Sequence, residues 1–426
     1  MSDITILRKL VFDGAKSKKI EINDVVLDRL NYELSVIEKL NVIEYFIIYS
    51  KIVEICNKQD LLRSYGRGSA CGSLVNYCLD ITKLNPLEHG LIFERFLIPL
   101  ISTFVDIDID IPSGYQEWVV EKLKIELPTH FIYFLATLPS TINESRKDLI
   151  INDVAYKKHA CGVIITSDKK PDSIATYDDT DYYYSLDIKN DPLIDHSKFD
   201  ILELEYLNKL DLIVKTIGNK YHPYNLPLND KKVFDFFKKG DLSNIFQFNY
   251  TQSIFSKFRP DSINDLTIIN AMFRPGPIAN IPHLIHNKQN GYRNRFPSDI
   301  RVHNILDETY GLLVYQETLY RLLNEISGFS FSEADIFKRK LTKTKDPEEI
   351  AQLKTKFVLG CRANSSLNVK EIEQLAQLIL GQILFSFQKS HSLSYSIIAY
   401  WGAYYKTHFE KEFESAFNLS EKYLQK

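Results

Sequence analysis

The chain has 426 residues, of which 45% are hydrophobic and 25% charged, a composition that provides for two or three folded domains with substantial cores. No apolar run is long enough to cross a membrane, and the first ten residues contain no signal-peptide core. The five cysteines have no CxxC spacing, which predicts reduced, mostly buried thiols rather than zinc ligands or disulfides. These features predict a cytoplasmic protein without membrane contact.

The formal net charge of −3 is unevenly distributed along the chain. Residues 1–230 contain 26 Lys and Arg against 35 Asp and Glu, a net −9, and residues 231–426 contain 26 against 20, a net +6. One interpretation of this asymmetry is that the acidic half binds metal and the basic half binds a polyanion. The other interpretation is chance.

The first predicted elements are helical. Residues 24–58 have apolar residues at helical spacing, and Asn23 or Asp24 is suited to cap the first turn. One stripe on this helical pattern is formed by Leu27, Leu30, Leu34, Ile37 and Leu40.

The turn-rich segment SYGRGSACGS follows at residues 64–73. Glycines let backbone N–H groups approach phosphate oxygens closely, a serine adds a donor, and Arg67 adds positive charge. The spacing is not that of a Walker A loop, and a plain turn before a helix is the simpler interpretation.

Residues 102–111, STFVDIDIDI, have an aspartate at every second position of a predicted strand. In a strand Asp106, Asp108 and Asp110 share one face, where their charges repel each other. A divalent cation would offset that cost, because magnesium and manganese prefer oxygen ligands. The alternative is a solvated edge strand with a charged face.

The following segments are less regular. KKHACGVIITSD (157–168) predicts a loop that enters a buried strand, and ILELEYLNKLDLIV (201–214) is either strand or helix. Two metal ions held by carboxylates can catalyse a phosphoryl transfer such as nucleotidyl transfer. Such a site requires a third carboxylate, for which Glu203, Glu205 and Asp211 are candidates that spacing alone does not separate. On a strand, Lys209 would share a face with Asp211.

After residue 230 a helical pattern continues to the C-terminus. This half contains KRKLTKTK (338–345), FRPGP (273–277) and QKSHSLSY (388–395), whose cations suit a triphosphate or a nucleic-acid backbone. A solvated helix face is the simpler interpretation of such a lysine run.

Together these segments resemble the bacterial C-family DNA polymerases, the DNA polymerase III alpha subunits. The likeness covers most of the chain in the family's order. Its segments are residues 29–59, 65–97, the DxDxD strand, 157–165, 202–213, 245–248, 260–282, 309–319, 328–349 and 385–413.

The resemblance implies an α+β fold, with a polymerase-beta-like nucleotidyltransferase palm and mostly helical fingers. It implies an N-terminal helical segment over 1–62, a palm over 63–230 with a reduced thumb insertion at about 111–156, and fingers over 231–426. The implied function is a template-directed DNA polymerase that adds deoxynucleotides to a primer 3′ end by phosphoryl transfer. The implied cofactor is a pair of Mg²⁺ ions, which Mn²⁺ can replace.

The same resemblance implies site residues. Asp108, Asp110 and Asp211 match the catalytic, metal-binding carboxylates. Positions implied to bind nucleotide or template are Arg67, Gly68, Ser69, Lys209, Arg274, Tyr315, Gln316, Arg339, Lys340, Lys343, Lys389 and His391.

The chain departs from the family pattern in having no room for a PHP domain and no clamp-binding or OB-fold region, so nuclease activity is not expected. We expect weak grip on the duplex, and partners that include primer-template DNA, dNTPs and a separate processivity or thumb-replacing protein. A catalytically inactive DNA-binding or regulatory module and a template-independent nucleotidyltransferase remain the alternatives.

Overall fold

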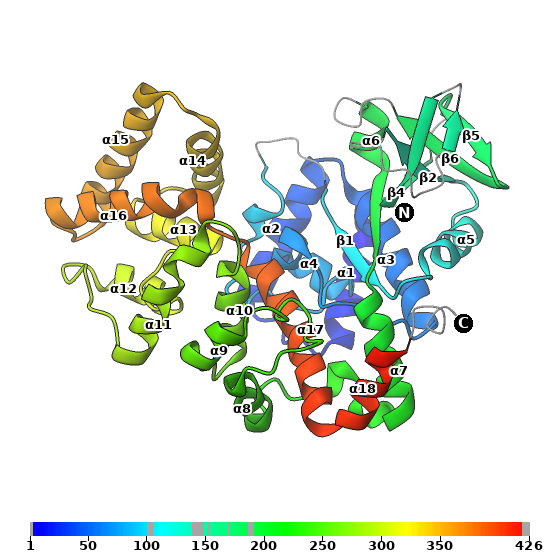
Figure 1. Ribbon diagram of the computed structural model, residues 1–426. Helices are drawn as coiled ribbons and strands as arrows, with labels where there is room; N and C mark the ends of the chain where they lie inside the picture. Colours follow the sequence, from blue (N-terminus) through cyan, green and yellow to red (C-terminus); the bar gives the residue numbers. More distant parts are fainter. Residues whose placement is uncertain are drawn as a thin grey trace.

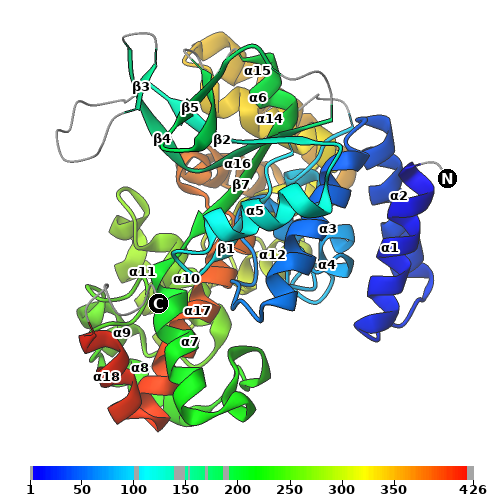
Figure 2. The same cartoon turned by 90° about the vertical axis from the view of Figure 1, so that its right-hand side faces the viewer.

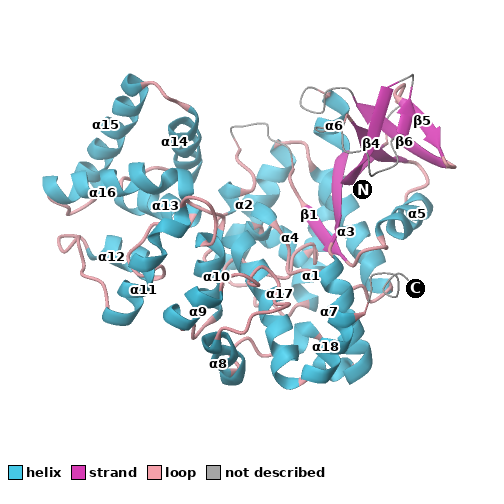
Figure 3. Ribbon diagram, viewed as in Figure 1, coloured by secondary structure: helices cyan, strands magenta, loops and turns pink. Residues whose placement is uncertain are grey.

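The computed structural model describes residues 3–99, 105–138, 149–151, 154–167, 171–185 and 191–419. Helices dominate these ranges and one mixed sheet accompanies them, which confirms the predicted α+β class (Figure 3). Figure 1 shows helices α12 to α16 gathered at one end of the molecule, strands β2, β4, β5 and β6 at the other, and β1 and α17 between them. None of the helices in the described ranges combines the length and apolar character that a bilayer crossing requires.

The N-terminal helices are α1 (Asp3–Ser17), α2 (Asp24–Lys39), α3 (Ile43–Lys58) and the short α4 (Leu74–Cys78). The Asn23 side chain accepts a hydrogen bond from the Val26 N–H, which confirms the predicted cap. The helical pattern predicted over 24–58 forms two helices, which are separated at Asn41, where the backbone adopts a left-handed φ of 57°. Leu27 is exposed, so the buried stripe of α2 begins at Val26.

The sheet has the strand order β1-β7-β4-β2-β6-β5, with β3 paired to β4. Its strands are β1 (Asp108–Ile111), β2 (Phe131–Thr137), β3 (Leu149–Ile151), β4 (Val154–Thr166), β5 (Ile174–Tyr177), β6 (Thr180–Ser185) and β7 (Lys198–Glu203). The strand predicted over 102–111 is regular only from Asp108, and residues 100–104 lie outside the described residues. The apolar segment 201–214 divides into the end of β7 and the helix α7 (Glu205–Ile217), so both alternatives hold in part.

The range 111–156, predicted to hold a thumb insertion, contributes directly to the sheet. It contains α5 (Gln116–Glu126) and β2, and β2 pairs with both β4 and β6. The described part of this range therefore belongs to the sheet and its covering helix, as the side view in Figure 2 also shows. Residues 139–148 and 152–153 lie outside the described residues.

After residue 230 helices follow one another to the end of the described chain, as predicted. The remaining helices are α6 (Pro192–Ser197), α8 (Lys231–Lys239), α9 (Gln252–Phe258), α10 (Ile263–Met272), α11 (Ile281–Asn290), α12 (Ile300–Asp307), α13 (Gln316–Arg321), α14 (Phe331–Lys343), α15 (Pro347–Asn364), α16 (Val369–Gln382), α17 (Lys389–His408) and α18 (Glu410–Asn418). Helix α17 is buried along almost its whole length, and Tyr400, Trp401 and Tyr405 are fully buried. It packs on α10 on one side and on the glycine-rich segment at Gly68–Gly72 on the other.

Candidate active site

Parallel pairing of β1 with β7 brings two aspartates together. Asp108 is the pairing partner of Asp200, so their side chains extend from neighbouring strands about 4.8 Å apart. Asp106, just before β1, adds a third carboxylate. One oxygen of each of these three residues lies within 4.8 Å of the others.

Tyr49 of α3 fixes the two strands relative to each other. Its hydroxyl donates to the Ile107 carbonyl at 2.6 Å and accepts from the Asp200 N–H at 3.1 Å. The ring is buried and packs against Phe199 at a centroid distance of 4.9 Å. Burial raises the pKa of Tyr49 well above its usual value, so the hydroxyl remains a neutral donor.

Two of these carboxylates, Asp108 and Asp106, have raised pKa values. Burial, followed by the charges of Asp106 and Asp200, raises the pKa of Asp108 to about 7. Burial and Asp200 also raise the pKa of Asp106. The group therefore has three hard oxygen donors and an unfavourable concentration of negative charge, which fits a magnesium-type cation.

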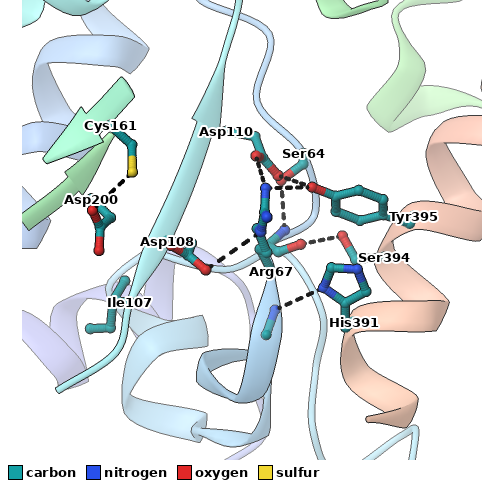
Figure 4. Close-up of polar contacts among 12 residues, drawn as sticks. Ser64, Arg67, Ile107, Asp108, Asp110, Cys161, Asp200, His391, Ser394 and Tyr395 are labelled. Atoms are coloured by element: carbon teal, nitrogen blue, oxygen red, sulfur yellow. Dashed lines mark hydrogen bonds and ion pairs between the residues drawn. The ribbon is translucent and has the colours of Figure 1, made fainter. Parts of the chain in front are cut away.

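Arg67 connects this group to Asp110. Its Nε lies 3.5 Å from the Asp108 carboxylate and its Nη1 lies 3.5 Å from that of Asp110 (Figure 4). Asp110 is 2% exposed and also accepts a hydrogen bond of 3.4 Å from the Tyr395 hydroxyl. Burial raises the pKa of Asp110 even though Ser64 and Arg67 favour its charged form.

Helix α17 holds the glycine-rich segment in place. Ser390 donates to the Gly68 carbonyl at 2.7 Å, and Ser394 donates to the Gly66 carbonyl. The Gly68 N–H donates to Nδ1 of His391 at 3.4 Å. Gly68 has a φ of 64°, a conformation that favours glycine.

His391, on α17, is a neutral side chain that accepts the hydrogen bond from Gly68. Burial, then the charges of Arg67 and Arg274, lower its pKa to about 4. The ring stacks on Tyr395 at 4.4 Å, and Tyr395 in turn accepts a hydrogen bond from Arg67 at 3.0 Å. The predicted Arg67, Gly68 and His391 are thus brought to the carboxylates, although His391 follows Gly68 by 323 residues in the chain.

Two predicted palm residues lie elsewhere. Asp211 and Lys209 are on the helix α7, not on a strand. Asp211 pairs with Lys215 at 2.7 Å, and Lys209 pairs with Glu205 at 3.0 Å. The structure does not bring Asp211 into the carboxylate group, whose third member is Asp200.

Among the predicted finger residues, several are tied to protein groups. Lys389 is 8% exposed, forms an ion pair with Glu308 and donates to the His89 carbonyl at 2.7 Å. Tyr315 is buried, and the Gln316 side chain donates to the Ser386 carbonyl at 3.3 Å.

The predicted cations divide into two groups. Arg339 pairs with the buried Asp335, and Arg274 donates to the Phe385 carbonyl at 2.8 Å while lying over the Phe387 ring at 4.1 Å. Lys340 and Lys343 are exposed on α14.

Ser69, predicted to bind nucleotide, is buried near the start of the short 3₁₀ helix Gly68–Gly72.

Sequence reasoning missed Asp200 and Tyr395. Lys198 and Asp200 alternate with Phe199 and Ile201, the same pattern of charge at every second position that identified the first strand. That signal was available for Asp200. Tyr395 had no comparable signal, because a tyrosine within an apolar helix is a common core residue.

Comparison with known proteins agrees with this architecture. Residues 5–155 match the family model for the bacterial DNA polymerase III alpha NTPase domain, and residues 203–365 match that for the bacterial DNA polymerase III alpha subunit finger domain. The chain is similar to the DNA polymerase III subunit alpha of Ureaplasma parvum, with 30% identity over 96% of this chain and 49% of that protein. The corresponding proteins of Bacillus subtilis and Staphylococcus aureus are 28% and 29% identical, over 95% and 93% of this chain and 42% and 43% of theirs.

The chain belongs to the family of bacterial C-family DNA polymerases, the DNA polymerase III alpha subunits. It spans about half the length, or less, of the curated relatives that it matches. The resemblance inferred from the sequence motifs is therefore confirmed.

Proposed function

We propose that this chain is a template-directed DNA polymerase, which adds deoxynucleotides to a primer 3′ end in a polymerase-beta-like palm over residues 63–230. The pairing of Asp108 with Asp200 in neighbouring parallel strands is the observation that carries this proposal. It supports Asp108, Asp110 and Asp200 as the metal-binding carboxylates, with Asp200 in place of Asp211. Asp106 lies close enough to assist them.

Bound Mg²⁺ ions would lower the pKa of the primer hydroxyl and neutralise charge on the leaving pyrophosphate. Arg67 now supplies the positive charge between Asp108 and Asp110. Once cations neutralise these carboxylates, its guanidinium is free to pair with triphosphate oxygens, for which its planar geometry is suited.

The glycine-rich segment and α17 would form the other wall of the nucleotide site. Gly68 lets the backbone approach a phosphate closely, and neutral His391 keeps the segment in position by accepting its N–H. On the fingers, proposed as residues 231–426, the exposed Lys340 and Lys343 are free to contact nucleic-acid phosphates.

Extension of a labelled primer on a defined template, with Mg²⁺ and dNTPs, tests this proposal. We expect template-matched products from the wild type, and a loss of about a hundredfold or more in Asp108→Asn and Asp200→Asn. Asp211→Asn is the matched control and should retain activity within a few fold, since it removes only a surface ion pair with Lys215.

Other outcomes assign the chain differently. Full activity in Asp200→Asn would refute the site assignment. Untemplated tails would identify a template-independent nucleotidyltransferase, and retention of DNA without any product would identify a binding module.

A further inference from the structure

A bulge in β4 directs two further metal-ligating side chains toward Asp200. The pairing of β2 with β4 passes from Phe134 and Val163 to Ala136 and Lys158, so two steps along β2 correspond to five along β4. The three additional residues on β4 form a bulge that includes His159 and Cys161. Bulges redirect side chains and are frequent beside functional sites.

The bulge is stabilised by its own residues. The Gly162 N–H donates to Nδ1 of His159 at 2.9 Å. A Cβ added to Gly162 would lie 2.9 Å from the Leu135 side chain and 3.0 Å from His159 Nδ1, so a larger residue here would force these side chains to shift. The His159 ring is therefore held against the backbone of the bulge.

The three potential ligand atoms are spaced as a metal site requires. The Cys161 thiol donates to Asp200 Oδ1 at 3.0 Å, a contact visible in Figure 4, and its Sγ lies 3.6 Å from His159 Nδ1. All three residues offer an atom within 4.8 Å of the others. Zinc bonds of about 2.0 to 2.3 Å in tetrahedral geometry separate neighbouring ligand atoms by about 3.5 Å, close to these distances.

We propose that His159, Cys161 and Asp200 form a second metal site, which binds a thiophilic divalent cation of the zinc class. Imidazole nitrogen, thiolate sulfur and carboxylate oxygen together are a zinc-type ligand set, whereas magnesium prefers oxygen alone. This site shares Asp200 with the Asp106–Asp108 group. Occupancy by zinc therefore withdraws Asp200 from that group and inhibits nucleotidyl transfer, a consequence that rests on the proposed function.

Binding exchanges existing contacts for metal bonds. The Cys161 thiol releases its proton to solvent and its sulfur bonds to the cation, while Asp200 Oδ1 gives up the thiol hydrogen bond. His159 Nδ1 gives up the Gly162 N–H, a small loss compared with the bonds formed to zinc. Asp200 Oδ2 remains paired with Lys198 at 2.5 Å.

Access distinguishes Cys161 from the other thiols. Cys161 and His159 are partly exposed, whereas Cys56, Cys71, Cys78 and Cys361 are buried. The spacing along the sequence did not indicate this site, because its ligands come from a bulge and from a strand about 40 residues later.

Co²⁺ titration of the full chain without DNA or nucleotide tests the site. Thiolate coordination gives a near-ultraviolet charge-transfer band, which we expect with one cobalt per chain and which Zn²⁺ should displace. Cys161→Ser should lose this band, and His159→Asn, which keeps an acceptor for the Gly162 N–H, should weaken cobalt binding at least about tenfold. Cys361→Ala is the control and should keep the band.

Absence of the band in a folded wild type, or its persistence in Cys161→Ser, would overturn the site. Circular dichroism establishes that each variant is folded. Because this readout needs no catalysis, its outcome is independent of whether the chain is a polymerase. In primer extension with Mg²⁺, Zn²⁺ should inhibit the wild type more strongly than Cys161→Ser, and equal inhibition would overturn the competition for Asp200.

Discussion

The substitution Asp108→Asn tests the electrostatics of the carboxylate group through protein stability alone. Burial, Asp106 and Asp200 raise the pKa of Asp108 from 3.8 to about 7 in the folded chain. The folded state therefore binds this proton more tightly than the unfolded state does. The resulting stability is complete below pH 4 and is lost as the pH rises through 7. Asparagine resembles the protonated acid and avoids this loss.

The magnitude follows from the size of the shift. A change from 3.8 to about 7 is roughly three pKa units, which corresponds to about 4 kcal/mol at 1.36 kcal/mol per unit. The nearby Arg67 guanidinium lowers the pKa of Asp108 but does not cancel the effect of burial and the neighbouring carboxylates. Because the Asp108 side chain is 21% exposed, solvent screens part of the effect, and we expect Asp108→Asn to be more stable than the wild type by about 2 to 4 kcal/mol at pH 8.

Urea unfolding in EDTA across pH 4.5 to 8 measures this difference. The gain in the variant should be largest at pH 8 and should shrink toward acid pH. Mg²⁺ should then stabilise the wild type and leave Asp108→Asn nearly unchanged, since ligand binding to the folded state raises its stability. A variant that is no more stable than the wild type at pH 8 in EDTA would refute the clustering of these carboxylates.

Asp211→Asn is the control for the same measurement. Its partner Lys215 is 67% exposed, so the lost ion pair should change the free energy of unfolding by less than about 1 kcal/mol. The change should not depend on Mg²⁺. A magnesium response lost in this control would return Asp211 to the metal site.

Three further predictions concern the frame around the site. Asp80→Ala removes the carboxylate that pairs with Arg63, a side chain 2% exposed, and should cost about 3 to 5 kcal/mol in urea unfolding; a smaller loss than about 1 kcal/mol would contradict this. Gly402→Ala brings a Cβ to 2.0 Å from a tyrosine hydroxyl and should destabilise the folded chain by about 1 to 3 kcal/mol. In Gly381→Ala the new Cβ meets no atom within 4 Å, so this variant should be more stable than the wild type by about 0.5 to 1 kcal/mol. Equal melting temperatures for the two variants would disprove the packing argument. The His391 ring, with its pKa lowered to about 4, should show no NMR titration between pH 8 and 6, and stability due to its neutral form should fall as the pH drops from 6.5 toward 4.

Several local features could be predicted from the sequence. The Asn23 cap, the helical C-terminal half and the α+β class follow from patterns within a few residues of each other. The alternation of Asp106, Asp108 and Asp110 identified the acidic strand before any pairing was known. The family resemblance came from the order of such local motifs, and the comparisons confirm it.

Local patterns alone did not decide between the candidates for the third carboxylate, even though charge alternates around Asp200 too. Within residues 198–217 the apolar side chains fit both the spacing of a strand and that of a helix. The change from β7 to α7 at residue 204 places Asp200 on the sheet and Asp211 on a helix. Burial of the helix against α17 and α18, a tertiary effect, favours that division.

The sequence by itself determined where charges alternate, where a backbone can turn, and which segments are helical, because these properties depend on near neighbours. Only the tertiary structure decided which charged groups meet. Asp108 and Asp200 are paired across two parallel strands, and Gly68 contacts His391 across more than three hundred residues. Such contacts depend on how elements pack together, and no spacing along the chain specifies that packing.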